Sequence, residues 1–378
     1  MKTYERISCA ITGAEDLEEL YTFKDFPIFM GCTEHPENLD VREDMIWYIS
    51  RGSGLIQLKR LLPLDILYEE PHGSGSVGRL WREHHRMFAK FVNIARPKTV
   101  LEIGGGHGLL EREYQRYDNT DWVILEPNPS PVDGCKARFI KGFFGKDFCL
   151  PYTPDAVVHS HLLEHIYMPN DFMNDLSAYM KEGSSLIFSV PNMDAMMERK
   201  YTNCINFEHT LLLTEPYIDY LLSANGYRIV SKEYFKDDHS IFISATKSSN
   251  VSVKDMPADL YEKNKKVFEN YIEYHKKLVQ SLNIKLLNSD RNVYLFSAHV
   301  FSQYLINMGL NTTKIICLLD NDQFKQGKRL YGTTLTVESP NVLKGVYQPV
   351  VILKTGVYNK EIKEDIWTNI NPSTIFLE

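Results

Sequence analysis

The sequence predicts an α/β protein with largely parallel sheets, and three observations lead to this class. Short apolar segments alternate along the chain with segments of helical periodicity. One of the apolar segments runs into a glycine-rich loop that precedes a helical segment. The chain has 378 residues, 43% of them hydrophobic and 24% charged, the balance of a globular protein with two or three domains.

The glycine loop lies in the segment KTVLEIGGGHGLLEREY, which predicts a buried strand at Val100–Ile103, a loop and then a helix. Glycines let the backbone approach a ligand, and the first N–H groups of the helix are free to bind it. About twenty residues later WVILEP predicts a second strand that ends at Glu126, where a carboxylate suits the two hydroxyls of a ribose. The glycines alone are also compatible with a tight turn in any α/β protein.

Two further strands are predicted in PDAVVHSHLLEHI and SSLIFSVPN, which completes four blocks in order. The blocks LEIGGGHG (101–108), LEP (125–127), DAVVHSHLLEHI (155–166) and LSAYMKEGSSLIFSVPN (176–192) resemble class I S-adenosylmethionine-dependent methyltransferases. The resemblance implies a Rossmann-like domain and S-adenosyl-L-methionine as cofactor. A dehydrogenase fits less well. The nicotinamide-binding fingerprint G-x-G-x-x-G would need a third glycine at position 109, where this chain has Leu109.

The same resemblance implies a set of cofactor-binding residues. Those implied near the methionine part, the ribose and the adenine are Glu102, Gly104, Gly105, Gly106, Gly108, Glu126, Pro127, Gly142, Phe143, Ser160 and His161. Among them Glu126 is expected to hold the ribose, while Gly142 and Phe143 are expected near the adenine.

The last third of the chain predicts a second, smaller α/β domain. TKSSNVSVKDMP (246–257) reads as a linker and the following segment as a long amphipathic helix, before three more apolar strands in NVYLFSA, KIICLLDN and QPVVILKT. Residues 318–343 resemble the C-terminal domain of sugar C-methyltransferases that act on nucleotide-linked deoxysugars. The matching residues are Asp320, Asn321, Lys325, Gln326, Gly327, Tyr331 and Gly332. In that family this domain completes the substrate cleft and binds no second cofactor.

The resemblance divides the chain into three parts: a degenerate zinc-binding-like unit at 1–70, the methyltransferase domain at 71–250 and a C-terminal Rossmann-like domain at 251–378. The family's four zinc ligands fall here on Cys9, Thr12, Ser50 and Ser53, so a single thiol remains and we expect no metal. Cys32 and His35 are a candidate substitute pair. The unit is expected to be held by a core of Phe26, Ile28, Phe29, Trp47, Tyr48 and Leu55.

The bulk properties predict the compartment and the partners. Six scattered cysteines without a C-x-x-C pattern indicate reduced, mostly buried thiols, and we expect a cytoplasmic protein. No apolar run approaches the roughly 20 residues of a membrane span, and a net charge of −7 argues against a nucleic-acid partner. We expect a monomer or homodimer whose partner is a small-molecule acceptor.

The catalytic residues are predicted from CINFEHTLLLTEP (204–216). In the sugar methyltransferases the matching segment reads Tyr-His-Glu-His and faces the methyl group. Glu208 and His209 match it, while Asn206 stands in place of the tyrosine. His165 matches a histidine near the substrate, and His72 stands where the family has a tyrosine. The alternative is a surface turn before a helix that begins after Thr214.

The resemblance implies roles for these residues, with His209 as the general base and Glu208 orienting it. Three functions stay open. The first is C-methylation of a nucleotide-linked keto-deoxysugar. The second is O-methylation of a sugar hydroxyl, which the replaced tyrosines favour. The third is an inactive cofactor-binding partner protein.

Overall fold

The computed structural model describes residues 3–67 and 78–378. The predicted site residue His72 lies outside the described residues. Three sheets carry the architecture, and two of them are parallel-rich sheets of an α/β protein, as the sequence predicts. In the described ranges, no helix combines the length and apolar character needed to cross a membrane.

The largest sheet has seven strands in the order β12-β13-β11-β10-β7-β8-β9. These strands are β7 (Thr99–Ile103), β8 (Asp121–Glu126), β9 (Arg138–Lys141), β10 (Ala156–Ser160), β11 (Ser185–Pro191), β12 (Tyr227–Phe235) and β13 (Ser240–Lys247). The four strands predicted around the glycine loop are confirmed as β7, β8, β10 and β11. Strands β7, β8, β9, β10 and β11 are parallel to one another, whereas β13 runs antiparallel to both β11 and β12. A dinucleotide-binding sheet has six parallel strands instead.

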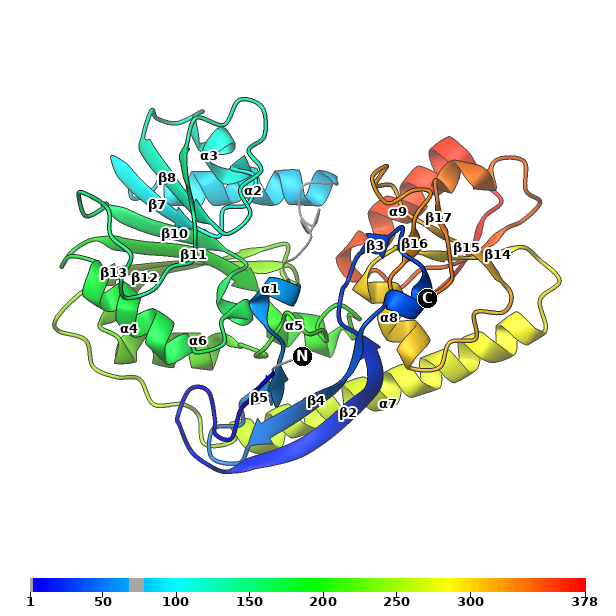
Figure 1. Ribbon diagram of the computed structural model, residues 1–378, viewed down its shortest axis with the longest axis horizontal. Helices are drawn as coiled ribbons and strands as arrows, with labels where there is room; N and C mark the ends of the chain where they lie inside the picture. Colours follow the sequence, from blue (N-terminus) through cyan, green and yellow to red (C-terminus); the bar gives the residue numbers. More distant parts are fainter. Residues whose placement is uncertain (1–2, 68–77) are drawn as a thin grey trace.

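Helices cover both faces of this sheet (Figure 1). On one face α2 (Arg79–Val92) and α3 (Leu109–Tyr114) pack over residues such as Val100 and Ile124. On the other face α4 (Pro169–Tyr179) and α6 (Glu215–Ala224) pack over residues such as Leu101 and Val123. Alternate residues of a strand point to opposite faces, which explains why the strands are apolar at nearly every position.

The C-terminal part holds a five-stranded sheet in the order β17-β15-β14-β18-β19, in which all neighbouring strands are parallel. Its strands and helices are β14 (Val293–Phe296), α8 (Val300–Asn307), β15 (Ile315–Leu319), β17 (Val337–Glu338), β18 (Val350–Ile352), α9 (Asn359–Asp365) and β19 (Ile375–Leu377). The three strands predicted here are confirmed as β14, β15 and β18. Of the predicted linker 246–257, residues 246 and 247 are the end of β13, whereas residues 248–259 form no helix or strand.

The third sheet is antiparallel and N-terminal, with β2 (Leu17–Pro27), β4 (Arg42–Ser50) and β5 (Ile56–Leu58). Short pairs join β1 (Tyr4–Glu5) to β6 (Arg60–Leu61), and β3 (Cys32–Thr33) to β16 (Arg329–Leu330). Four of the six predicted core residues are buried: Phe26, Ile28, Trp47 and Leu55. The prediction is wrong for Phe29 and Tyr48, which are half-buried. Phe29 follows the end of β2 with its ring against Tyr331, whereas Tyr48 alternates along β4 with buried residues, so its ring lies on the other face of the sheet, under Lys59.

The four positions that match zinc ligands lie at two adjoining turns. Cys9 Sγ lies 3.2 Å from Ser53 Oγ, the Ser53 N–H donates to Ser50 Oγ, and the Thr12 N–H approaches Cys9 Sγ at 3.4 Å. Hydrogen bonds between these side chains and the backbone therefore join the turns. The substitute pair is split, since Cys32 is buried against the Ala298 carbonyl while His35 is exposed. All six cysteines are free thiols, and four of them are buried.

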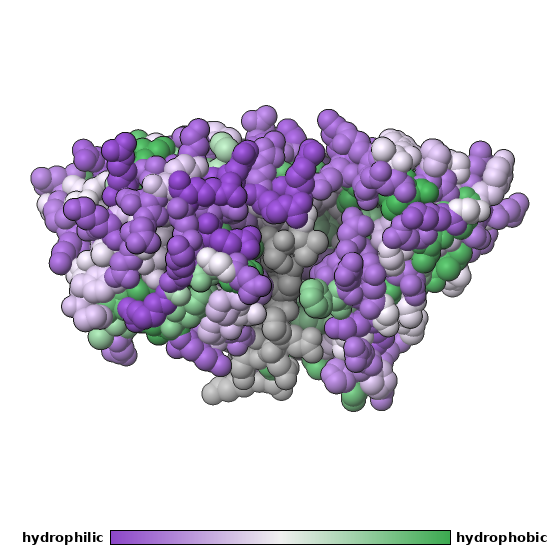
Figure 2. Space-filling view, turned by 90° about the horizontal axis from the view of Figure 1, so that it is seen from above, coloured by the Kyte–Doolittle hydropathy of each residue, from purple (hydrophilic) through white to green (hydrophobic). Residues whose placement is uncertain are grey.

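The helix α7 (Leu260–Leu287) confirms the predicted amphipathic helix and connects the parts of the molecule. It runs along the N-terminal sheet toward the C-terminal sheet (Figure 1). One hydrophobic cluster contains residues of both sheets and of α7, with Trp47 and Phe268 in ring contact at 6.3 Å. The outer surface in Figure 2 is largely hydrophilic, with hydrophobic residues in small separate areas.

Phe268→Ala is expected to destabilise the protein by about 3–5 kcal/mol, because the ring is fully buried between α7 and β4 and its loss leaves a cavity. Chemical denaturation measures the loss of free energy of unfolding. Ile284→Ala is the matched control, since this side chain of the same helix is 61% exposed and should change stability by less than about 0.5 kcal/mol. Equal effects of the two substitutions would contradict the role given to α7.

Candidate functional site

A cavity of about 1020 Å³ lies where the carboxyl ends of the two parallel sheets meet. Its lining includes residues of the loops after β7, β8 and β10, the segment around residues 201–209, and the loops after β14, β15 and β18. Ligands of open α/β sheets bind outside the carboxyl ends of the strands. The volume is at the upper end of the ~300–1,000 Å³ usual for a small-molecule pocket, which leaves room for two ligands side by side.

The glycine loop forms one wall of this cavity. The Gly104 N–H donates to the Leu125 carbonyl at 2.8 Å, and Gly104 and Gly106 both have positive φ, at 71° and 52°. At Gly105 a Cβ atom would lie 2.7 Å from Glu102 Cδ and 2.8 Å from Ile124 Cγ2. The loop therefore packs so closely on the sheet that Gly105 has no room for a side chain, and its other side faces the cavity, where a ligand can approach the backbone.

Glu126 connects this loop to the end of β8. Its carboxylate accepts from the Gly106 N–H and from the Asn128 N–H, both at 3.0 Å. Pro127 follows it in the cavity lining. The carboxylate is thus fixed at the cavity wall, where it can accept from two neighbouring ligand hydroxyls.

The remaining cofactor-binding candidates are placed differently from one another. Glu102 is 3% exposed and accepts from Trp122 Nε1 at 2.8 Å, so it supports the loop from behind. Burial raises the pKa of Glu102 to about 8, and the group is therefore largely a neutral acid at pH 7. Gly142 and Phe143 lie at the cavity next to Glu126, because the Gly142 N–H donates to the Glu126 carbonyl. Ser160 also lines the cavity, at the end of β10, and Gly108 begins α3 with a φ of 75°.

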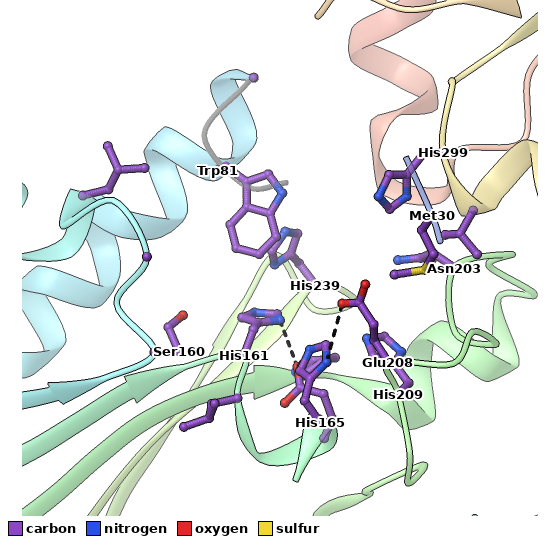
Figure 3. Close-up of a pocket in the computed structure, with 18 of the residues that line it drawn as sticks. Met30, Trp81, Ser160, His161, His165, Asn203, Glu208, His209, His239 and His299 are labelled. Atoms are coloured by element: carbon purple, nitrogen blue, oxygen red, sulfur yellow. Dashed lines mark ion pairs between the residues drawn. The ribbon is translucent and has the colours of Figure 1, made fainter. Parts of the chain in front are cut away.

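Two histidines and two glutamates form a cluster on the cavity wall (Figure 3). His165 Nδ1 lies 3.8 Å from Glu208 Oε2, and His165 Nε2 lies 3.8 Å from Glu164 Oε1. The rings of His165 and His209 meet edge to face at 5.2 Å. The structure therefore brings together the predicted residues His165, Glu208 and His209 from two separate loops.

His209 has the arrangement of a base. Its Nδ1 lies 3.2 Å from the Cys204 carbonyl, so Nδ1–H is the donor and Nε2 carries the lone pair. Burial lowers the pKa of His209 below its ordinary value, while the neighbouring Glu164 acts in the opposite sense. The imidazole is consequently neutral at pH 7 and able to accept a proton.

Asn206 holds the turn that presents these residues. Its Oδ1 accepts from the backbone N–H groups of Glu208 and His209, at 2.8 and 2.7 Å, and its Nδ2 donates to the Asn203 carbonyl. In this structure Asn206 is thus a positioning residue. The alternative of a surface turn is wrong, because Glu208 is only 8% exposed. Thr214 does occupy the N-cap position of α6, without a capping bond from its side chain.

Glu164 is a residue that sequence reasoning missed. It is 1% exposed, and neither of its carboxylate oxygens has a hydrogen-bond partner among the described residues. Oε1 lies 3.5 Å from His161 Nδ1 and 3.8 Å from His165 Nε2, and burial raises the pKa of the carboxyl. The only signal was its position before His165, which did not reveal a buried side chain.

His161 was predicted at the cofactor, and its side chain belongs to a second cluster with His84 and His239 beside Trp81 (Figure 3). Burial lowers the pKa of His161 and of His239 to about 3 and also lowers the pKa of His84, so all three are neutral at pH 7. Although the sequence predicts no metal, two groups in the described ranges have the composition and spacing to hold a metal ion: His84–His161–His239 and Glu164–His165–His209.

The similarity to known proteins lies in the part of the chain around the glycine loop. Residues 77–232 match a family described as "Methyltransferase domain". No curated protein matches the chain. An O-methyltransferase family protein from Burkholderia thailandensis shares 15% identity over 46% of this chain and 57% of its own, with a TM-score of 0.37.

Two further solved structures are similar at the same level. Human N-acetylserotonin methyltransferase, solved with S-adenosylmethionine, shares 16% identity over 44% of this chain and 52% of its own, with a TM-score of 0.36. An S-adenosylmethionine-dependent methyltransferase from Clostridium acetobutylicum shares 10% identity over 46% and 94%, with a TM-score of 0.36. This chain thus spans a little over half the length of the first and of the human protein.

Gly105→Ala is expected to weaken binding of S-adenosylhomocysteine about 10- to 100-fold, because the new methyl group overlaps Glu102 and Ile124 and displaces the loop at a cost of about 1–3 kcal/mol. Calorimetry measures the affinity. The matched control is Gly145→Ala, where a Cβ atom meets nothing within 4 Å. The interpretation of the loop fails if both variants bind as the unchanged protein does, or if that protein binds no ligand.

Proposed function

Because residues 77–232 match a methyltransferase domain, we propose that this chain is an S-adenosylmethionine-dependent methyltransferase and that it methylates a nucleotide-linked sugar. The glycine loop and Glu126 would hold the cofactor, which supplies a methyl group on a positively charged sulfur. What remains for the chain's other residues is to orient the acceptor and to take up its proton.

The observation that carries this proposal is that one cavity spans both parallel sheets. On the C-terminal side it reaches the loops after β14, β15 and β18. In the sheet order β14 lies between β15 and β18, so the strand order reverses at this point, which is where open α/β sheets bind ligands. A cofactor on one sheet and an extended acceptor on the other account for the size of the cavity.

The side chains on the C-terminal wall suit a nucleotide-linked sugar. Asp320 accepts from the Ala298 N–H at 2.9 Å and lies 3.2 Å from Lys325 Nζ. Both residues line the cavity together with Asn321, His299 and Thr355. Carboxylate and amide oxygens accept from sugar hydroxyls, and the ammonium group of Lys325 suits a phosphate. Asp320, Asn321 and Lys325 also carry the resemblance to the sugar methyltransferases, and residues 251–378 would then be the acceptor half of the enzyme.

Proton removal is assigned to His209. Its Nδ1–H is held by the Cys204 carbonyl, so the acceptor proton would move to Nε2. His165 contacts His209 by its ring edge and lies between the carboxylates of Glu164 and Glu208. Negative charge beside the imidazoles stabilises the positive charge that appears when a histidine takes up a proton.

Charge also bears on the atom that is methylated. C-methylation beside a ketone passes through an anionic enolate, which needs hydrogen-bond donors or cations nearby. The described cluster instead holds two glutamates, and the amide of Asn206 is bonded to the backbone. A hydroxyl acceptor needs only a base and hydrogen-bond acceptors, so O-methylation fits this cluster best. C-methylation stays the second candidate, because Glu208 and His209 match the residues of the sugar C-methyltransferases.

Incubation with S-adenosylmethionine and a panel of nucleotide sugars is expected to give S-adenosylhomocysteine with at least one of them. NMR of the product made with an isotope-labelled methyl group should show a methoxy carbon. A methyl group on carbon would select the second candidate. Turnover of free sugars or unrelated acceptors, with none of the nucleotide sugars, would contradict the proposed substrate class.

His209→Gln is expected to lower kcat about 10²- to 10⁴-fold at unchanged cofactor affinity, because the base is lost and the loop after β7 is untouched. Since only the neutral imidazole accepts a proton and its pKa is lowered, the rate should fall with acidification only below pH ~6.5. This acidic limb should be missing in the variant.

The control is His35→Gln, which changes an exposed histidine outside the cavity lining. It should leave kcat and the pH profile unchanged. Turnover of His209→Gln at the level of the control would exclude His209 as the base.

A further inference from the structure

The three histidines His84, His161 and His239 converge from distant parts of the methyltransferase sheet. His84 lies on α2, His161 directly after β10, and His239 in the turn between β12 and β13. Their ring centroids are 5.4 to 5.9 Å apart, and one nitrogen of each lies within 4.8 Å of one nitrogen of each of the others. Figure 3 shows His161 and His239 below Trp81.

Each of these rings is held through one nitrogen by a serine hydroxyl. Ser189 lies 3.0 Å from His84 Nε2, while Ser240 lies 2.9 Å from His161 Nε2 and 2.6 Å from His239 Nδ1. A metal-binding histidine usually has its other ring nitrogen held by a hydrogen bond, most often to a carboxylate, a backbone carbonyl or water, and serine hydroxyls take that place here.

The second nitrogen of His84 points to a missing ligand. His84 is fully buried, and its Nδ1 has no hydrogen-bond partner among the described residues. A buried polar atom without a partner lowers the stability of the fold by about 1–3 kcal/mol. If the three rings only packed against one another, apolar aromatic rings could take their place without this cost. The second nitrogen of His161 is its Nδ1, which lies 3.5 Å from Glu164 Oε1, so a carboxylate is close enough to balance a cation.

We propose that His84, His161 and His239 bind a Zn²⁺ ion. Neutral imidazoles suit this ion, and three of them leave a fourth position open. That position faces the cavity, because His161 and His239 line it. Nitrogens bound to a tetrahedral Zn²⁺ at ~2.1 Å are roughly 3.4 Å apart, so the rings need to close by no more than about 1.4 Å from the 4.8 Å limit. The site is independent of the proposed acceptor.

The test is metal binding by the full chain, with zinc stoichiometry measured by elemental analysis after dialysis. The unchanged protein is expected to retain about one zinc per chain. His84→Gln and His239→Gln should each lower the zinc affinity at least tenfold. Substitution by Co²⁺ gives a second readout, since a tetrahedral site has visible absorption bands and the unchanged protein should show them.

Three control variants separate this site from its neighbours. His85→Gln changes the adjacent histidine, whose Nδ1 is bonded to the Trp81 carbonyl. Cys9→Ser removes the remaining thiol of the N-terminal turns, and His209→Gln changes the other histidine cluster. All three should keep the zinc. The proposal is overturned if the unchanged protein binds neither zinc nor Co²⁺, or if zinc is lost with His209→Gln and kept with His84→Gln.

Discussion

The buried guanidinium of Arg6 is the interaction on which the candidate site depends. It donates to the carbonyls of Thr210 and Tyr167, each at 2.7 Å, and to the Leu58 carbonyl at 3.3 Å. Burial lowers the pKa of Arg6 to about 10, so the group is still charged at pH 7 and its hydrogen bonds are charge-assisted. One side chain of the first strand region therefore joins the two loops that carry Glu164, His165, Glu208 and His209.

This arrangement explains why the N-terminal unit packs where it does. The Thr210 N–H donates to the Glu164 carbonyl, and the bridge between Gln57 and Leu211 continues the pairing toward β5. Without such partners the carbonyl groups of these loops would be buried without hydrogen bonds, which would lower the stability of the fold. The unit therefore serves the site by supplying donors.

The elements that could be predicted are those that a short segment of sequence determines by itself. The strands β7, β8, β10 and β11 and the glycine loop were predicted because each is an apolar run or a turn signal read over a few residues. The helix α7 was predicted from its periodicity alone. Phe29 and Tyr48 were assigned to the core because aromatic residues favour burial, but Phe29 follows the end of β2 and Tyr48 lies on the less buried face of β4.

What escaped prediction is set by tertiary contacts. Glu164 appears as a charged residue in a short turn, and only the packing of residues 206–210 over that turn buries its carboxylate. His84, His161 and His239 are separated by 77 and 78 positions, and no periodicity connects a helix, a strand end and a hairpin turn. The resemblance suggested His161 as a cofactor contact from its place after β10; its side chain lines the cavity and also contacts His84 of α2, which the sequence did not reveal.

The charges of the two clusters explain how one cavity can serve a cationic cofactor. Glu164 and Glu208 lie on either side of His165, and Glu164 also approaches His161. A buried carboxyl with a raised pKa becomes more acidic when positive charge arrives nearby, because the ion then gains a partner. A positively charged sulfur nearby would favour the ionised form of Glu164, and its conversion to a neutral thioether would remove that advantage. Glu164 would therefore strengthen binding of the methyl donor relative to the demethylated product.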